Sequence, residues 1–442
     1  MSKKILTKLN FTSLYKSKKA YYYSLAFLAF LIPIISKGLP LVILGTGIIG
    51  VFYYVIANRK IGKEKNNYIL LPYNLLRDSF SNIIKSRNSL LFMMCFFLCY
   101  LVSVFYSDNK EVAWNGVLLK SSFLYFPILF SLTKWDIEKV KRVFDYFILG
   151  CFTNLVLSYL FVLINAKGGL ELNDFMSTSL SFSFHRSYIA MYVNIAIILN
   201  TIVLLSENFN ESRVIVSFRW VLQVLFSLFV IMLSSRSGLL TWFISISCIV
   251  IYILIVQKKL TKSIAVISVL GLLFTFSVNN LSLLGERMDE TVKTISTSNY
   301  EQGENGRFTS TGIRVGVGKA SLSVLKTSPI LGVGVGDVEI ELMKEFKNRR
   351  MLNCFTNKYN SHNQYLDTGL AVGLVGVLVL CVILFFSFIK YGKLTILTFA
   401  IMGVIGGDML VESMLDKQAG AIFISWIIAL IVSAKPVLKS LK

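Results

Sequence analysis

Apolar runs long enough to cross a lipid bilayer recur along this 442-residue chain and constrain its fold more than any other feature. Each run has roughly 17 to 25 residues, enough for a helix to cross a hydrocarbon core of about 30 Å. Hydrophobic residues make up 55% of the chain and the mean hydropathy is +0.67. This composition excludes an ordinary soluble domain and predicts an all-α, polytopic membrane protein.

Twelve candidate spans can be separated, and an even number places both termini on one side of the membrane. The basic residues gather in the N-terminal segment, in alternate short connections and in the C-terminal tail. By the positive-inside rule this side is cytoplasmic, so the net charge of +21 points to lipid headgroups and not to nucleic acid. The spans are predicted over residues 20–37, 39–57, 88–106, 114–133, 143–165, 187–205, 216–234, 237–256, 263–279, 365–389, 394–411 and 419–435.

One long polar segment divides the chain. Residues 1–279 hold nine predicted spans, residues 280–364 form an extracytoplasmic loop domain, and residues 365–442 hold three more spans. A connection of this length is usually functional, and long loops cross the membrane largely regardless of their charge. We expect one or two short helices in it, on or near the outer membrane surface.

The clearest of these helices is predicted over residues 311–326, followed by a stop at Pro329 and a flexible Gly-rich turn at 332–336. The apolar residues that share one face of this helix are Ile313, Val317, Ala320 and Val324.

The sequence predicts neither disulfides nor a metal. Five of the six cysteines lie inside apolar runs, where packing explains them. No Cys/His cluster has the spacing of metal ligands, and we expect no cofactor.

Arginines at the predicted outer edge are candidates for substrate binding. Arg236 lies between two spans with almost no loop, where a charge faces either a cavity or a partner, or reaches to the headgroups. Arg314 opens the external helix, and its alternative is a solvated surface charge. Arg307 and Arg186 are further candidates of the same kind.

The chain has two histidines, and both lie at predicted outer membrane edges. His362 immediately precedes a span, and His185 stands beside Arg186; each is either structural or a proton acceptor. Glu412 near the last outer loop is either an ordinary interfacial acid or a partner for the arginines. Arginines suit a diphosphate because guanidinium groups offer paired donors, and a neutral histidine nearby can accept a proton from an attacking hydroxyl.

Three motifs, taken in order, resemble the bacterial O-antigen ligase and O-antigen polymerase superfamily. They are Ser-Arg-Ser-Gly at 235–238, Arg314 followed by Lys-Thr-Ser-Pro-Ile-Leu-Gly-Val-Gly-Val-Gly at 326–336, and Ser-His-Asn-Gln-Tyr-Leu at 361–366 with Gly-Leu-Val-Gly at 373–376. The resemblance covers about residues 180–420, and only the predicted topology extends it to the first half.

The resemblance implies a metal-independent glycosyltransferase of the bacterial inner membrane with a broadly GT-C-like helical fold and a periplasmic active site. The implied donor is a glycan linked to undecaprenyl diphosphate. A ligase transfers it to the lipid A core, and a polymerase transfers it to another lipid-linked repeat unit. A single displacement would invert the anomeric centre.

The resemblance also assigns residues. Arg236 and Arg314 match the family's essential arginines, and His362 matches its essential histidine. Weaker matches place His185, Arg186 and Tyr188 in a His-x-x-Tyr-type element and Glu412 at an acidic position before the last span. The arginines are expected to hold the diphosphate, and His362 is expected to deprotonate or orient the acceptor hydroxyl.

Alternatives remain open at the level of sequence. A ligase acting on the lipid A core, a repeat-unit polymerase and a protein O-oligosaccharyltransferase differ in their acceptor. From another class, a flippase or transporter of lipid-linked oligosaccharide would place polar residues along a path through the membrane. Polar residues within the predicted spans are sparse, with Lys120 and Asn154 as examples, which favours chemistry at the outer face.

Overall fold

The computed structural model describes residues 19–35, 37–63, 71–86, 88–165, 172–209, 211–280 and 310–441. Every regular element within these ranges is helical, so the all-α prediction is confirmed. Nine helices or helix pairs in this part of the chain are long and apolar enough to cross a membrane. The protein is therefore a multi-pass helical membrane protein.

The nine candidate spans agree with predicted ones, and three predicted spans lie outside this group. Residues 19–31 are helical, α11 covers Leu260–Asn280, and the apolar α18 covers Gln418–Ser433. The count of twelve and the GT-C-like arrangement stay predictions. The nine are Leu39–Ile56, Ser89–Tyr106, Lys110–Ser131, Ile137–Asn165, Arg186–Leu205, Arg213–Met232, Arg236–Ile255, Gln364–Phe385 and Gly392–Val411.

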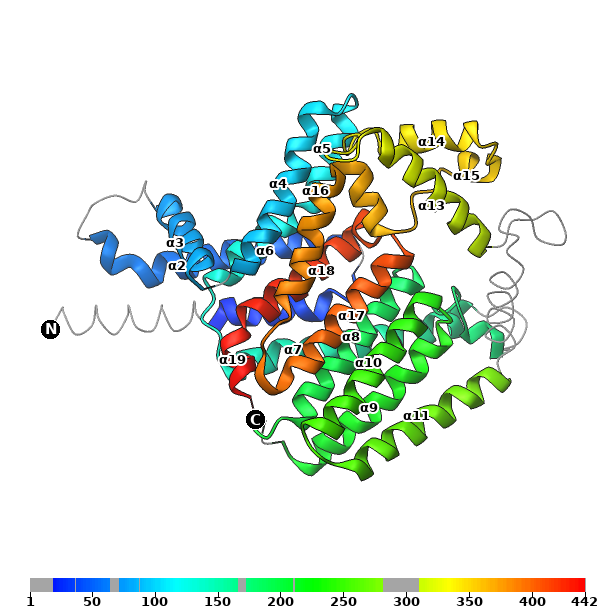
Figure 1. The fold of residues 1–442 in the computed structure, drawn as a ribbon. Coiled ribbons are helices and arrows are strands. Elements are labelled where there is room, and N and C mark those ends of the chain that lie inside the picture. Colours follow the sequence, from blue (N-terminus) through cyan, green and yellow to red (C-terminus); the bar gives the residue numbers. More distant parts are fainter. Residues whose placement is uncertain are drawn as a thin grey trace.

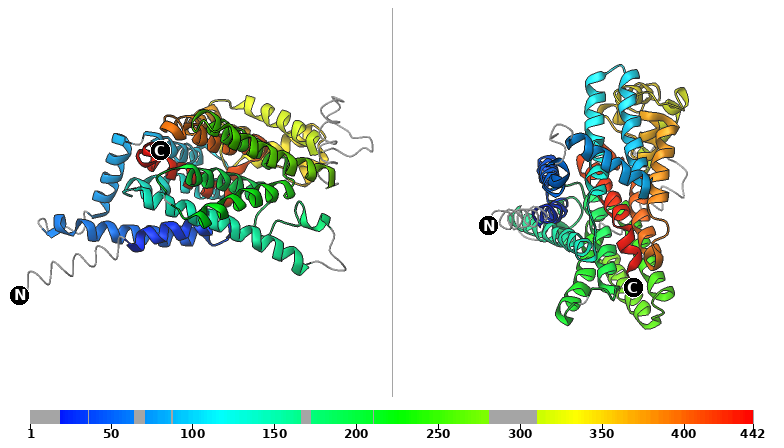
Figure 2. Two further views of the ribbon diagram at one scale, coloured as in Figure 1. Left: turned by 90° about the horizontal axis from the view of Figure 1, so that it is seen from below. Right: turned by 90° about the vertical axis from the view of Figure 1, so that its left-hand side faces the viewer.

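Two stretches differ from their sequence-based description. The span predicted over 114–133 is divided into α5 (Lys110–Lys120) and α6 (Ser122–Ser131) at Ser121, whose N–H donates to the Leu118 carbonyl three residues back at 3.2 Å. The basic connection predicted between the second and third spans contains a helix of its own, α3 (Leu71–Ser86). In Figure 1 and in the left view of Figure 2, α3 and α2 (Leu39–Lys63) lie on the side of the molecule away from α13 to α15.

Helix α8 (Arg186–Leu205) is the central element, with 94% of its span buried. It packs against α7 (Ile137–Asn165), α9 (Arg213–Met232), α10 (Arg236–Ile255) and α17 (Thr395–Val411), as Figure 1 shows.

Small residues let α8 and α10 approach closely. A Cβ atom on Gly238 would lie 2.4 Å from the Cβ of Ala190, so only glycine fits there. Asn194 then donates hydrogen bonds to the Gly238 carbonyl at 2.9 Å and to the Thr241 hydroxyl at 3.0 Å. This contact fixes α8 and α10 side by side in the same direction, so both begin at the same end of the bundle. We call it the His362 end, after the residue described below.

The opposite end of α7, α8 and α9 is held by a network of partly buried charges. Arg219 contacts Asp145 and Glu211, each at 2.6 Å, and Lys141 contacts the same two carboxylates at 2.7 Å. Asn200 completes the network by accepting a hydrogen bond from Arg219 at 3.2 Å. Each charge has a partner, so this cluster joins helices and opens no polar path through the membrane.

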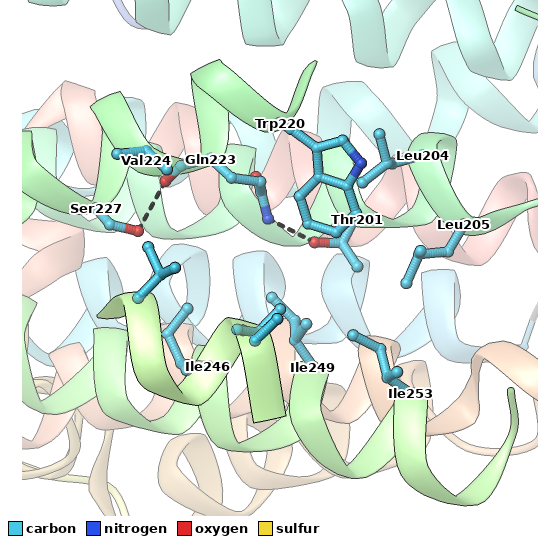
Figure 3. Close-up of a pocket in the computed structure, with 13 residues that line it drawn as sticks. Thr201, Leu204, Leu205, Trp220, Gln223, Val224, Ser227, Ile246, Ile249 and Ile253 are labelled. Atoms are coloured by element: carbon cyan, nitrogen blue, oxygen red, sulfur yellow. Dashed lines mark hydrogen bonds between the residues drawn. The ribbon is translucent and has the colours of Figure 1, made fainter. Parts of the chain in front are cut away.

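An apolar cavity of about 380 Å³ lies beside this charge cluster, between α8, α9, α10 and α11. Figure 3 shows Trp220 and Gln223 on one side of it and isoleucines of α10 on the other. Gln223 donates a hydrogen bond to Thr201 at 2.8 Å, so this polar side chain on the wall is already bonded within the protein.

The long polar segment folds into three short helices where the structure describes it: α13 (Ser310–Thr327), α14 (Val338–Asn348) and α15 (Leu352–Thr356). The predicted apolar face of α13 is confirmed, because Val317, Ala320 and Val324 are buried in a small core of their own. That core also contains Phe346 of α14 and Leu370 of α16, so the three short helices pack on the membrane bundle.

A backbone joint ties this segment to α16 (Gln364–Ser387), which is interrupted at Val372 and Gly373. The Val333 N–H donates to the Leu370 carbonyl at 2.7 Å, and the Leu374 N–H donates to the Pro329 carbonyl at 2.9 Å. Gly373 has φ +69°, and a Cβ atom there would lie 1.9 Å from the Ile330 carbonyl oxygen. The predicted Gly-rich turn is therefore a packed connection.

Candidate functional site

Five elements meet at the His362 end of the bundle: the starts of α8, α10 and α16, the end of α17, and the first turns of α13. The side-chain oxygens of Ser187 on α8 and Ser235 at the start of α10 lie 3.3 Å apart. Helix α17 ends at Val411, and Glu412 follows it directly. Residues from three regions that are distant in the sequence thus meet near one carboxylate.

Glu412 bridges the two central candidates. Arg314 of α13 donates from Nη2 to Oε1 of Glu412 at 2.6 Å, and Nδ1 of His362 lies 3.3 Å from Oε2. The three side chains are 31%, 20% and 27% exposed for Arg314, Glu412 and His362 respectively. We refer to them as the Arg314–Glu412–His362 cluster; each of its side chains is partly buried and partly exposed.

The cluster keeps Glu412 ionised. Burial alone raises the pKa of Glu412, but the hydrogen bond with His362 and the positive charge of Arg314 outweigh it, and the pKa is lowered. His185 also belongs to this neighbourhood, since it interacts electrostatically with all three members. Partial burial lowers the pKa of His185, and Glu412 opposes that shift. His185 is thus favoured as a neutral imidazole.

The backbone presents His362 in an uncommon conformation. Its φ of +46° lies in the left-handed region, which residues other than glycine adopt rarely and mostly at constrained sites. The His362 N–H donates to the side chain of Asn360 at 3.2 Å, and the ring stands edge-on to Tyr359. Asn363 then caps α16, because its side chain accepts from the Leu366 N–H at 3.0 Å. A tight turn therefore aims His362 at Glu412.

The remaining predicted residues fall into three groups. Arg236 is the first residue of α10, at the same end of the bundle, and its neighbour Ser237 interacts with Asp408 one turn before Glu412. Tyr188 is an electrostatic neighbour of Glu412, and Arg186 donates to Ser177 at 2.6 Å, toward the segment that precedes α8. Arg307 lies outside the described residues.

Sequence reasoning missed how central Glu412 is. The resemblance makes Glu412 only a weaker match, whereas in the structure Glu412 is the partner of both Arg314 and His362. The available signal was an acid directly after a span at the same predicted level as two basic candidates. Within the described ranges, no three His, Cys, Asp or Glu side chains gather as a metal site. The arrangement offers a charge-oriented imidazole next to guanidinium groups.

Comparison with known proteins finds one family that resembles part of this chain. The sequence profile of the O-antigen ligase family matches residues 221–381, which include Arg236, Arg314 and His362. A Haemophilus influenzae protein, described as uncharacterized, is 28% identical over 166 residues, covering 36% of this chain and 41% of that protein. The chain thus matches less than half the length of this curated relative. The match over residues 221–381 is similarity to the O-antigen ligase family and supports placing the chain in that superfamily.

Proposed function

We propose that this protein is an extracytoplasmic glycosyltransferase that moves a glycan from undecaprenyl diphosphate to an acceptor hydroxyl. The observation that carries the proposal is the Arg314–Glu412–His362 cluster, with distances of 2.6 and 3.3 Å from one carboxylate to a guanidinium and an imidazole. The similarity to the O-antigen ligase family supports a lipid-linked glycan as the donor. The lipid A core is the first candidate acceptor, as in an O-antigen ligase.

The cluster suits His362 to act as a general base. When Nδ1–H donates to Glu412, the lone pair of the imidazole is on Nε2, where it can accept the proton of an acceptor hydroxyl. Glu412 stabilises the imidazolium that forms, as a carboxylate does behind a catalytic histidine in hydrolases. The hydroxyl oxygen then attacks the anomeric carbon as the bond to the diphosphate breaks, which inverts that centre.

The arginines would stabilise the leaving group. Arg314 donates to Glu412 through Nη2, and its planar guanidinium carries further N–H donors that suit phosphate oxygens. Arg236, at the first position of α10, adds a second positive charge at a helix start, where backbone N–H groups favour anions. Charge that develops on the diphosphate is thereby balanced, and no metal is required in this scheme.

The distribution of charge supports an outer location for the site. Lys141 at the start of α7 lies at the end of the bundle opposite to His362, because α7 and α8 run in opposite directions along the bundle. The basic residues that the positive-inside rule places in the cytoplasm include Lys141 and its neighbours. With that end inside the cell, the His362 end faces the periplasm and both termini are cytoplasmic.

The decisive test supplies purified protein in detergent or liposomes with glycan-linked undecaprenyl diphosphate and separate acceptors. Transfer to lipid A core indicates a ligase, and transfer to a second lipid-linked repeat indicates a polymerase of the same superfamily. His362→Ala is expected to abolish transfer while the protein still inserts into the membrane. Movement of the donor across liposomes without any new glycosidic bond would instead identify a flippase.

A further inference from the structure

A buried lysine lies directly behind the candidate site. Lys120 is the last residue of α5, and its side chain is only 3% exposed. It donates from Nζ to the Leu415 carbonyl at 2.6 Å and lies 3.9 Å from the Asp416 carboxylate. An ammonium group at such depth in a membrane protein is costly, so a lysine there marks either a functional role or a structural bond.

Lys120 interacts electrostatically with two adjacent carboxyl groups, those of Asp416 and Asp367. Asp367 in the first turn of α16 is buried and its carboxyl group interacts directly with that of Asp416. Two neighbouring carboxyl groups repel each other when both are ionised, and Lys120 supplies the nearby positive charge that offsets this repulsion. Tyr100 covers the other side, with the Lys120 ammonium 5.2 Å from its ring centre.

The group formed by Lys120, Asp367 and Asp416 is connected to His362 by a short chain of hydrogen bonds. Asp416 accepts from the Asn360 side chain at 3.0 Å, and the oxygen of that same Asn360 side chain accepts from the His362 N–H at 3.2 Å. Asn360 therefore joins Asp416 to the turn in which His362 has a positive φ.

Two further contacts join the loop of residues 413–416 to the turn of residues 359–363 and the start of α16. The Leu415 N–H, one peptide unit from the carbonyl that Lys120 holds, donates to the side chain of Gln364 at 2.6 Å. The side-chain oxygens of Ser361 and Ser413 lie 3.2 Å apart. Glu412 directly precedes residues 413–416 and His362 lies in residues 359–363, while Lys120 contacts Leu415 and Asp416 from the buried side.

We infer that Lys120 is a positioning residue, which sets the distance between His362 and Glu412 by anchoring the 413–416 loop through Leu415 and Asp416. The inference deepens the proposed function and rests on it. Lys120 has no contact with the cluster itself, so it acts through the loop. A shift of about 1 Å at a reacting group can lower a rate by about 10²-fold.

Lys120→Met tests this inference because methionine keeps the length and apolar stem but has no donor or charge. We expect turnover in the glycan-transfer assay to fall about 10²-fold while KM for the donor stays within about threefold of wild type. The matched control is Lys110→Met, since Lys110 also donates to backbone carbonyls, of Val104 and Phe105, but belongs to neither loop. Lys110→Met is expected to retain wild-type turnover.

Asn360→Ala provides a second variant that leaves the buried charge in place. It removes the link between Asp416 and the His362 backbone, and its turnover is expected to fall as in Lys120→Met. Because both changes act through one chain of contacts, the double variant should be no slower than the slower single variant. Lys110→Met combined with Asn360→Ala should give independent effects.

The outcomes separate this inference from the proposed function. Full transfer by His362→Ala would overturn the proposed function, and the inference with it. An inactive His362→Ala together with wild-type turnover in Lys120→Met and Asn360→Ala would overturn the inference alone. Should Lys120→Met fail to accumulate in membranes, Asn360→Ala decides: reduced turnover with unchanged donor KM supports the inference, and wild-type turnover rejects it.

Discussion

Arg314 donates a hydrogen bond of 2.6 Å to Glu412, across 98 positions of the sequence. The bond joins α13 of the long polar segment to the end of α17 in the membrane bundle. It leaves the second carboxylate oxygen for His362. One acidic side chain thus fixes both a guanidinium and an imidazole, and its removal is expected to affect both.

Glu412→Gln is expected to lower glycan transfer by about 10²–10⁴-fold. The neutral amide cannot stabilise an imidazolium as a carboxylate does. Its NH₂ group would also face either the Arg314 guanidinium or the N–H of His362, and both of these are donors themselves. The measurement is turnover of the purified variant with saturating donor. A matched control is Glu345→Gln, because Glu345 pairs with Arg349 at 2.6 Å on α14, away from His362. Equal effects of the two changes would refute a special role for Glu412.

The stability that Glu412 contributes is expected to depend on pH. Its pKa in the folded protein is lowered, so the folded state favours the carboxylate. The contribution is fully present above the pKa of an unfolded glutamate, about 4.3, and is lost as the pH falls through the lower folded value. The difference in melting temperature between wild type and Glu412→Gln should be constant from neutral pH to about 5 and shrink below about 4. A difference that grows in acid would contradict this.

Gly373→Ala is expected to destabilise the protein by at least about 2 kcal/mol. Alanine at this position would have to adopt the positive φ of +69°, which side-chain-bearing residues rarely do. Its methyl group would also collide with the Ile330 carbonyl oxygen. Thermal unfolding in detergent measures the effect. Gly318→Ala is the control, because nothing lies within 4 Å of a Cβ there and Gly318 is inside helix α13, where alanine is favoured. Gly318→Ala should keep or raise the melting temperature.

Arg219→Met is expected to cost about 3–5 kcal/mol of stability, because it leaves Glu211 and Asp145 with Lys141 as their remaining cation in the cluster. The protein that still folds should transfer glycan with wild-type turnover, since this cluster lies at the far end of α8 from His362. Arg213→Met, at an exposed position of α9, serves as the comparison and should change neither quantity. A selective loss of turnover would show that the two ends communicate.

Periodicity and charge predicted much of this molecule because they report on single elements. The face of α13 that contains Val317 and Ala320 follows from the helical repeat alone, and the structure buries it. The apolar runs likewise predicted the positions of the candidate spans. The interruption of α16 was not predictable in this way, since Gly373 stands in a continuous apolar run and the break depends on where Ile330 docks.

Contacts between distant segments also limit how much of the candidate site can be predicted from the sequence. Residue types and the predicted side of the membrane place His362 and Arg314 in one candidate site. The place of Glu412 between them, and of Lys120 beneath the 413–416 loop, depends on pairings across 50 to 295 positions. A local sequence pattern does not show which residues pair across such sequence separations. Each of these residues fits the pattern of its own helix or turn, whatever its distant partner is.

The joint between residues 329–333 and α16 has a consequence for engineering specificity. The polar segment shares backbone hydrogen bonds with a membrane-crossing helix, so it is not a removable lobe. Grafting residues 310–356 from a relative with another acceptor would leave the broken turn of α16 without its partners. Chimeras should therefore exchange the segment and α16 together, as one inherited unit.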